Sequence, residues 1–304
     1  MNRSGDPTDT NDIVRRQNLP TEGFLVKLQR LLPAKFIGRV VRRAALSQNG
    51  FLKELLIRNF IRLYKVDLSD AKNSDPASYP SFNAFFTREL REGARPIDEQ
   101  HNAAISPADG TLAEAGPIRG SQLIQAKGIH YTIEQLFAGQ EMAAQQFVNG
   151  SFATVYLAPY NYHRIHMPLA GTLTESVYVP GGLLSVNTAT TAQVQGLYAQ
   201  NERLIHIFRG EQGPFAVIMV GAMNVGSMTT SWRGEIPRRV RQSGHHFLHT
   251  TNDPRSRFNK GDYLGHFNLG STVIFIAGPE QLRWEQNLRS GMRLRVGERI
   301  GTLN

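Results

Sequence analysis

Apolar side chains recur at helical spacing in the first third of the chain. The leucine, isoleucine and phenylalanine positions between residues 51 and 65 lie three or four residues apart, which predicts an amphipathic helix. Residues 23–46 have a similar pattern. We expect Pro33 to divide that segment into two pieces, because proline lacks the backbone donor that a helix interior needs. Ser81 is placed to cap a further helix over residues 82–90.

From about residue 103 the pattern changes to short apolar runs bounded by glycine and proline. Such runs predict β-strands, and residues 175–179 alternate in the manner of a strand with one buried face. A short helix is predicted at residues 133–137. The expected strands are 153–157, 173–179, 204–208, 216–220 and 273–276. We therefore expect an α+β fold, in which N-terminal membrane-associated helices precede a β-rich core that is barrel-like or sandwich-like.

These patterns divide the chain into three parts. Residues 1–22 are polar and predict a disordered tail. Residues 23–100 predict a basic, amphipathic helical region that binds a membrane, and residues 101–304 predict a β-rich domain that contains the candidate catalytic residues. No stretch is long and apolar enough to predict a transmembrane helix, and the polar start has no signal-peptide pattern. We therefore expect a peripheral protein.

Positive charge is concentrated in the predicted helical region. The chain has a formal net charge of +9, and residues 23–65 contain ten lysines and arginines but a single acid, Glu54. A nucleic-acid-binding protein or an ordinary solvated helix face can carry such an excess. Here the cations are interleaved with leucine, valine and phenylalanine, a mixture typical of helices that lie on anionic membranes. We expect binding to an anionic membrane and no binding to nucleic acid.

Three polar residues far apart in the sequence form a candidate catalytic set. The chain has no cysteine, which excludes thiolate nucleophiles, disulfides and cysteine-ligated metals. Ser271 can act as a nucleophile if a histidine removes its proton, and a carboxylate can fix the tautomer of that histidine. His166 and Asp109 are the candidates for these roles. A membrane-associated serine hydrolase that uses these three residues is one function open to the chain, and a non-catalytic β-domain tethered to membranes is another.

The residue before Ser271 indicates a different use of the same hydroxyl. Gly270 has no Cβ, so the Ser271 hydroxyl can approach the Gly270 carbonyl closely. Attack on that carbonyl would form an ester, and elimination would separate residues 1–270 from residues 271–304. Tautomerisation and loss of ammonia would then leave a pyruvoyl group on the downstream piece. Gly-Ser-Thr alone is a weak signal, because such tripeptides commonly mark a turn.

Further segments, read together with this one, point to a family. The most specific are Leu269-Gly270-Ser271-Thr272, Pro107-Ala108-Asp109-Gly110 and Tyr162-His163-Arg164-Ile165-His166-Met167-Pro168. The others are Lys260-Gly261, Gly265-His266-Phe267, Val179-Pro180-Gly181, Leu184-Ser185-Val186-Asn187, Asn201-Glu202-Arg203 and Val220-Gly221-Ala222. In these segments and in their order the chain resembles the bacterial phosphatidylserine decarboxylases, from about residue 24 to about residue 301. Ala158-Pro159-Tyr160-Asn161 and Gly182 depart from the family pattern, which bears on headgroup contacts and not on the reaction.

The resemblance implies a pyruvoyl-dependent decarboxylase made as a proenzyme that cuts itself between Gly270 and Ser271. It implies that Asp109, His166 and Ser271 form the charge relay for self-cleavage. Ser271 would become the covalent pyruvoyl cofactor, which forms a Schiff base with the substrate amine. His163 would contact the substrate or assist decarboxylation. His163 and His166 could instead ligate a metal, but no third ligand stands at a familiar spacing, so no metal is expected.

The resemblance also implies partners and a location. The substrate would be phosphatidylserine in an anionic membrane, and the product phosphatidylethanolamine, as a step of phospholipid biosynthesis. The large chain, residues 1–270, and the small chain, residues 271–304, would stay together as a heterodimer, and a higher oligomer is left open. The enzyme would be peripheral on the cytoplasmic face of the bacterial inner membrane.

Overall fold

The computed structural model describes residues 34–126, 128–222, 227–236, 246–248, 254–268 and 271–304. Within these ranges the fold is α+β, as expected, with helices first and strands dominant from residue 103 onward. The described strands form open sheets rather than a closed barrel. The predicted tail, residues 1–22, lies outside the described residues, and so does the part of the helical pattern before residue 34.

The N-terminal layer consists of short helices. They are α2 (Ala34–Ala45), α3 (Gly50–Tyr64), the 3₁₀ helix η1 (Pro76–Ser78) and α4 (Phe82–Phe86). Helix α3 confirms the helix predicted over residues 51–65. The Asn49 side chain caps it by accepting a hydrogen bond from Leu52 N, and Lys65 ends it in the left-handed conformation. Helix α2 confirms part of the helical pattern of residues 23–46, whereas Pro33, where we expected a break, lies outside the described residues.

Helix α4 is shorter than the helix predicted over residues 82–90. It has the expected cap, Ser81, but it ends at residue 86. Beyond that point the backbone groups form other hydrogen bonds. Thr87 O accepts from Arg164 Nε at 2.9 Å, and Arg91 N donates to Asp70 O, in the loop after α3, at 2.9 Å. A continued helix would have paired Arg91 N with Thr87 O. Tertiary contacts therefore end the helix early.

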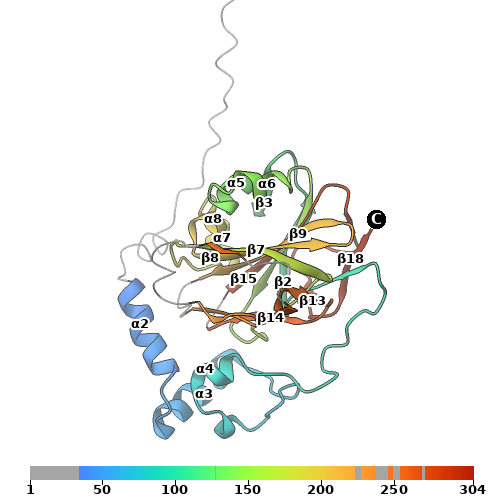
Figure 1. Ribbon diagram of the computed structural model, residues 1–304. Coiled ribbons are helices and arrows are strands. Elements are labelled where there is room, and N and C mark those ends of the chain that lie inside the picture. Colours follow the sequence, from blue (N-terminus) through green and yellow to red (C-terminus); the bar gives the residue numbers. More distant parts are fainter. Residues whose placement is uncertain (1–33, 127, 223–226, 237–245, 249–253, 269–270) are drawn as a thin grey trace, which may run out of the picture.

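The largest sheet forms the centre of the molecule (Figure 1). Its strand order is β12-β7-β8-β9-β15-β5-β2-β17, and β13 pairs with β7 as well. The strands are β2 (Gly110–Pro117), β5 (Ser151–Leu157), β7 (Gly171–Val179), β8 (Arg203–Gly210), β9 (Gly213–Gly221), β12 (His246–Leu248), β13 (Arg257–Phe258), β15 (Ser271–Ala277) and β17 (Arg293–Leu294). Every strand predicted from the apolar runs is present in it.

Both faces of this sheet are buried. On β7, Leu173 and Tyr178 belong to one apolar cluster, and Val177 belongs to another. The half-buried alternation predicted for residues 175–179 is therefore wrong, because Ser176, Val177 and Tyr178 are all buried. A strand covered on both sides has no solvent face that would require polar side chains.

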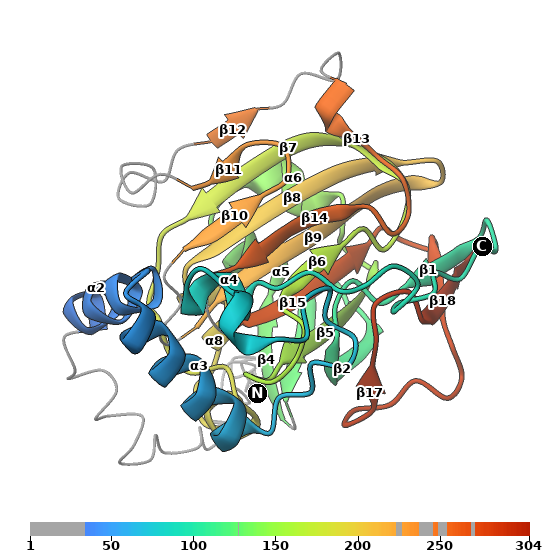
Figure 2. The ribbon, with the colours of Figure 1, turned by 90° about the horizontal axis from the view of Figure 1, so that it is seen from below.

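Different elements cover the two faces (Figures 1 and 2). One cover contains α5 (Ile133–Phe137), which confirms the predicted short helix, and α6 (Glu141–Gln145), α7 (Thr188–Thr191) and α8 (Leu197–Gln200). The other is a four-stranded sheet of β11 (Gly234–Glu235), β10 (Met228–Thr230), β14 (Tyr263–Phe267) and β6 (Arg164–His166). The N-terminal helices lie beyond this smaller sheet, so the candidate site residues on β6 lie between two layers.

The remaining strands form two small sheets. One is ordered β1 (Ala103–Ile105), β18 (Arg299–Leu303) and β16 (Leu282–Trp284), and the other pairs β3 (Gln122–Ala126) with β4 (Ile129–Thr132). A further 3₁₀ helix, η2 (Pro254–Ser256), precedes β13. The pairing of β1 with β18 joins the beginning of the β-rich region to the C-terminus of the chain.

Candidate active site

Ser271 is the first residue of β15, in the middle of the largest sheet. Its backbone is paired with Leu157 of β5 on one side and with Gly221 of β9 on the other. The residues that follow it in the strand are buried. Gly270 lies outside the described residues, so the structure describes the predicted cleavage site only at the backbone of Ser271.

Asn268 fixes the chain shortly before this junction. Its Nδ2 donates to Ser227 Oγ at 2.7 Å and to Thr229 Oγ1 at 3.0 Å. Its Oδ1 accepts from Asn83 Nδ2 on α4 at 3.1 Å. The Asn268 side chain is thus held from two sides, by β10 and by the N-terminal helical layer.

Backbone hydrogen bonds bring the Asp109 segment and the His166 segment together. His166 N donates to Pro107 O at 2.8 Å, and Ile105 N donates to Pro168 O at 3.1 Å. These bonds join the end of β1 and the turn after it to β6 and the turn that follows. Two of the predicted site residues, distant in the sequence, therefore lie in one region.

The His166 imidazole has a defined tautomer. Its Nδ1 lies 2.8 Å from Gly261 O, and because a carbonyl can only accept, Nδ1 carries the proton. Nε2 is then the acceptor of the hydrogen bond from the Tyr162 hydroxyl at 3.0 Å. Burial lowers the pKa of His166 below its usual range, although the Gly261 carbonyl and the negative charge of Asp109 oppose that shift. A neutral imidazole with an unprotonated Nε2 is the form that a general base requires.

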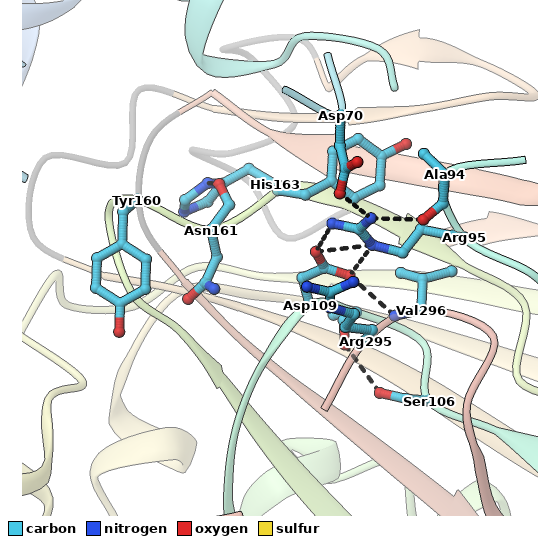
Figure 3. Close-up of polar contacts among 12 residues, drawn as sticks. Asp70, Ala94, Arg95, Ser106, Asp109, Tyr160, Asn161, His163, Arg295 and Val296 are labelled. Atoms are coloured by element: carbon cyan, nitrogen blue, oxygen red, sulfur yellow. Dashed lines mark hydrogen bonds and ion pairs between the residues drawn. The ribbon is translucent and has the colours of Figure 1, made fainter. Parts of the chain in front are cut away.

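Asp109 is held by Arg95 (Figure 3). Arg95 Nη2 donates to Asp109 Oδ2 at 2.6 Å, Arg95 Nε lies 3.0 Å from each carboxylate oxygen, and Val296 N donates to Oδ1 at 2.9 Å. The other end of the guanidinium donates to Asp70 at 2.8 Å. Burial alone would lower the pKa of Arg95, but the hydrogen bonds and charge of Asp109 raise it above its usual range. Arg95 thus remains a cation between two carboxylates.

Asp109 acts on His166 through its charge in this structure. Among the described residues, the hydrogen bonds of Asp109 go to Arg95 and Val296, whereas His166 Nδ1 donates to Gly261. The tautomer that we expected a carboxylate to fix is therefore fixed by a backbone carbonyl. The predicted charge relay stays a prediction, with the two residues placed in one region and linked by electrostatics.

His163 has a different environment from His166. The residue precedes β6, and its ring lies against Phe86 with ring centroids 4.0 Å apart. Nδ1 donates to Asn161 O at 2.8 Å, and Nε2 is buried without a hydrogen-bond partner among the described residues. Burial lowers the pKa of His163 to about 3. The imidazole is therefore neutral and offers an unused acceptor.

A cleft of about 450 Å³ opens beside His166. Tyr162, His166 and Arg95 line it, together with Lys72 and residues 89–93. His166 is half-buried and is one of the residues that line this cleft. A water molecule or another small polar molecule therefore has access to the imidazole.

Sequence reasoning missed several residues of this region. Arg95 is one of a run of arginines and has no distinguishing local pattern. Tyr162 belongs to the quoted histidine segment but was given no role, and Asn268 stands beside the cleavage motif without belonging to it. Arg88, buried after α4, was also missed. The available sequence signal for Arg88 was its place directly after a segment rich in phenylalanine, whereas Arg95 had no such signal.

Comparison with known proteins places these residues in context. A family model described as phosphatidylserine decarboxylase matches residues 82–302, and a second model, described as PSD, matches residues 24–65. The first match contains Asp109, His163, His166 and Ser271. The second covers the basic, apolar segment at the N-terminus.

Curated relatives align with nearly the whole chain. A phosphatidylserine decarboxylase proenzyme of Ectopseudomonas mendocina is 45% identical over 279 residues, which is 90% of this chain and 96% of the relative. The proenzyme of Azotobacter vinelandii is 44% identical over 273 residues, with 90% and 96% covered. That of Coxiella burnetii is 42% identical over 280 residues, with 92% and 98% covered.

Replacing Arg95 with methionine is expected to lower the free energy of unfolding by about 3–5 kcal/mol, because it leaves the buried Asp109 without its cation. Urea denaturation followed by circular dichroism measures the loss. Arg91→Met is the matched control, since Arg91 also pairs with Asp70, at 3.4 Å, but its side chain is 60% exposed. We expect that control to lose less than about 1 kcal/mol. Equal losses in the two variants would contradict the role given to Arg95.

Proposed function

Because the chain belongs to the phosphatidylserine decarboxylase family, we propose that it converts phosphatidylserine to phosphatidylethanolamine and carbon dioxide, with a pyruvoyl group made from its own Ser271. The observation that carries this proposal is the position of Ser271. It begins a central strand, lies within the matched family region, and follows the Leu-Gly of the processing motif. The serine is therefore placed where a new chain end can stay fixed in the sheet.

Self-cleavage would use the residues of the candidate site. His166 Nε2 takes the proton of the Ser271 hydroxyl, and the oxygen attacks the Gly270 carbonyl carbon. The proton then passes to the Ser271 nitrogen as the C–N bond breaks, so that an ester replaces the amide. Removal of the Ser271 Cα proton then breaks the Cβ–O bond and releases Gly270 as a carboxylate. The remaining alkene tautomerises to an imine, and water replaces its nitrogen, which leaves as ammonia. The cleft beside His166 is the route we assign to that water.

The surroundings of Ser271 fit a pyruvoyl group at that position. Backbone bonds to β5 and β9 would hold the new end of the small chain. His163 offers a neutral, buried imidazole with an unpartnered Nε2 among the described residues. When formed, the group supplies an electrophilic carbonyl that can take up the electron pair left at Cα as carbon dioxide departs. We assign to His163 the contact with the substrate headgroup or the handling of a proton at that carbon.

We also propose that the N-terminal layer binds the anionic membrane in which the substrate lies. On α3, the residues Phe51 and Leu63 are 80% and 73% exposed, and Arg58 and Arg62 are exposed on the same helix. Exposed apolar and cationic side chains together suit an anionic bilayer surface. No helix of the described residues is long and apolar enough to cross a membrane. The location we propose is the cytoplasmic face of the bacterial inner membrane.

After cleavage, we propose, the two chains remain together as a heterodimer. The small chain, residues 271–304, would contribute β15 to the middle of the largest sheet, where β5 and β9 of the large chain flank it. It would also contribute β17, paired with β2, and β18, paired with β1. Separating the chains would expose the buried side chains of β15, which strongly favours the complex.

Changing Ser271 to alanine tests the proposed function. The wild-type protein is expected to consist of two chains, residues 1–270 and a small chain with a blocked N-terminus, and to form phosphatidylethanolamine. Ser271→Ala should give one uncut chain and no product. Intact-mass spectrometry and a decarboxylation assay measure the two properties, and Ser290→Ala, an exposed serine, is the control that should be cut and active. An active wild type with a continuous chain, or one labelled by a serine-hydrolase reagent at Ser271, would refute the proposal.

The pH dependence of self-cleavage follows from the His166 environment. Because burial lowers the pKa of His166, the neutral base is present at pH 7 and is lost only as the pH falls through that lowered pKa. The rate is expected to stay near its maximum from about pH 8 through about pH 6.5, the usual midpoint of histidine, and to fall only at lower pH. His166→Ala should slow cleavage by about 100-fold or more. Precursor made by cell-free translation and followed by gel electrophoresis gives both rates. A rate already halved at pH 7.5 would exclude His166 as the base.

The membrane proposal predicts the effect of charge on the exposed face of α3. The double variant Phe51→Glu, Leu63→Glu is expected to bind vesicles of phosphatidylserine and phosphatidylethanolamine roughly tenfold more weakly or worse, because it removes two apolar contacts and adds repulsion. Vesicle sedimentation measures the affinity. Met142→Glu is the control, since Met142 is 89% exposed on α6, which lies on the far side of the largest sheet (Figure 1). Equal binding of both variants would refute the proposed surface.

A further inference from the structure

Arg88 is a buried cation with almost no partner. It follows α4, and only 5% of it is exposed. Its Nε and Nη1 have no hydrogen-bond partner among the described residues, and its Nη2 reaches only Tyr160 O, at 3.3 Å. The guanidinium carbon lies 5.5 Å from the centre of the Phe85 ring. Arginine keeps its charge when buried, so this arrangement leaves a positive charge that an anion would stabilise.

The unpartnered atoms of Arg88 belong to the same region as the free acceptor of His163. Phe86, two residues before Arg88, packs against the His163 ring. Burial is the main cause that lowers the pKa of His163, and the positive charge of Arg88 lowers it further. Tyr160 and Asn161 provide the carbonyls that accept from Arg88 and from His163. The cationic Arg88 and the His163 Nε2 acceptor, both without a hydrogen-bond partner at these atoms among the described residues, thus lie in one region.

This region adjoins the strand that leads to the cleavage site. Phe267 N donates to His163 O at 3.4 Å, and Phe267 is the last residue of β14. Asp109 and Arg95 also act on Arg88, with opposite effects, and are already paired with each other, while the Asp67 side chain, which Arg88 also influences, accepts from Ser69 N. A bound anion would therefore not have to displace an existing partner of Arg88.

Phosphatidylserine carries two anionic groups, and the reaction distinguishes them. Decarboxylation takes negative charge away from the carboxylate, so a cation on that group would stabilise the ground state more than the transition state and slow the step. The phosphodiester keeps its charge throughout. A cation there binds substrate and transition state equally, which affects KM and leaves kcat nearly unchanged.

We propose that Arg88 binds the phosphodiester of the phosphatidylserine headgroup through Nε and Nη1, beside His163. This inference rests on the proposed function. It assigns to the end of α4 the recognition of a lipid phosphate, and it separates that role from the self-cleavage residues. Product phosphatidylethanolamine retains the phosphodiester, so it would use the same contact.

The test compares Arg88→Met and Arg88→Lys with the wild type, all as purified full chains whose cleavage is checked by mass spectrometry. For Arg88→Met we expect normal self-cleavage, a KM for phosphatidylserine in mixed micelles about 10- to 100-fold higher, and a kcat within about twofold, which reflects loss of a charge-assisted hydrogen bond. Arg88→Lys keeps the charge and should be affected less. Arg119→Met, an exposed arginine in the turn before β3, is the control with unchanged KM.

Two soluble inhibitors identify which anionic group Arg88 binds. Glycerophosphoglycerol carries a phosphodiester without a carboxylate, and O-methyl-L-serine carries a carboxylate without a phosphate. Arg88→Met should weaken inhibition by the first about tenfold or more and leave the second unchanged. The reverse pattern, or a KM within twofold of the wild type, overturns the proposal. If Arg88→Met does not fold, the same comparison of KM and of the two inhibitors is made with Arg88→Lys, and the same results overturn the proposal. A wild type that neither cuts itself nor forms phosphatidylethanolamine would instead refute the proposed function.

Discussion

The hydrogen bonds along both edges of β15 are the constraint on which the site depends. They place Ser271 between Leu157 and Gly221, in a sheet that is buried on both faces. A residue at this position cannot shift along the strand without breaking bonds to both neighbours, and a shift by one residue would also exchange the two faces of the strand. The chemistry proposed at the junction therefore takes place at a fixed point, while the groups that act on it come from other layers.

Those layers give two histidines of one short segment different properties. His166 lies beside a cleft, with its tautomer fixed by Gly261 O and its lone pair toward Tyr162. His163 is enclosed against Phe86 and keeps a free acceptor among the described residues. The two side chains have different surroundings because His166 lies on β6, whereas His163 precedes that strand and packs against α4. These different surroundings are consistent with the separate roles proposed above, His166 in the precursor and His163 in the mature protein.

The sequence predicted the elements whose signals are local. Helix α3 and strands β5, β8, β9 and β15 have strong periodicity or clear apolar runs, and the family motifs located Asp109, His166 and Ser271. The end of α4 was predicted too late because it depends on Arg164, which lies far along the chain and donates to Thr87 O. No local sequence pattern indicates that contact. The Arg95 pair was missed for a similar reason, since its partners Asp70 and Asp109 lie 25 and 14 residues away. Burial of β7 on both faces likewise depends on elements that pack against it only in the folded chain.

The hydrogen bond between Asn83 and Asn268 has a consequence for how the parts move. It ties α4, whose Phe82, Phe85 and Phe86 are packed in the aromatic interior of the helical layer, to the residue that immediately precedes the cleavage motif. A displacement of α4 would therefore either move Asn268 with it or break this hydrogen bond. The position of the helical layer and the position of Asn268 are thus not independent of each other.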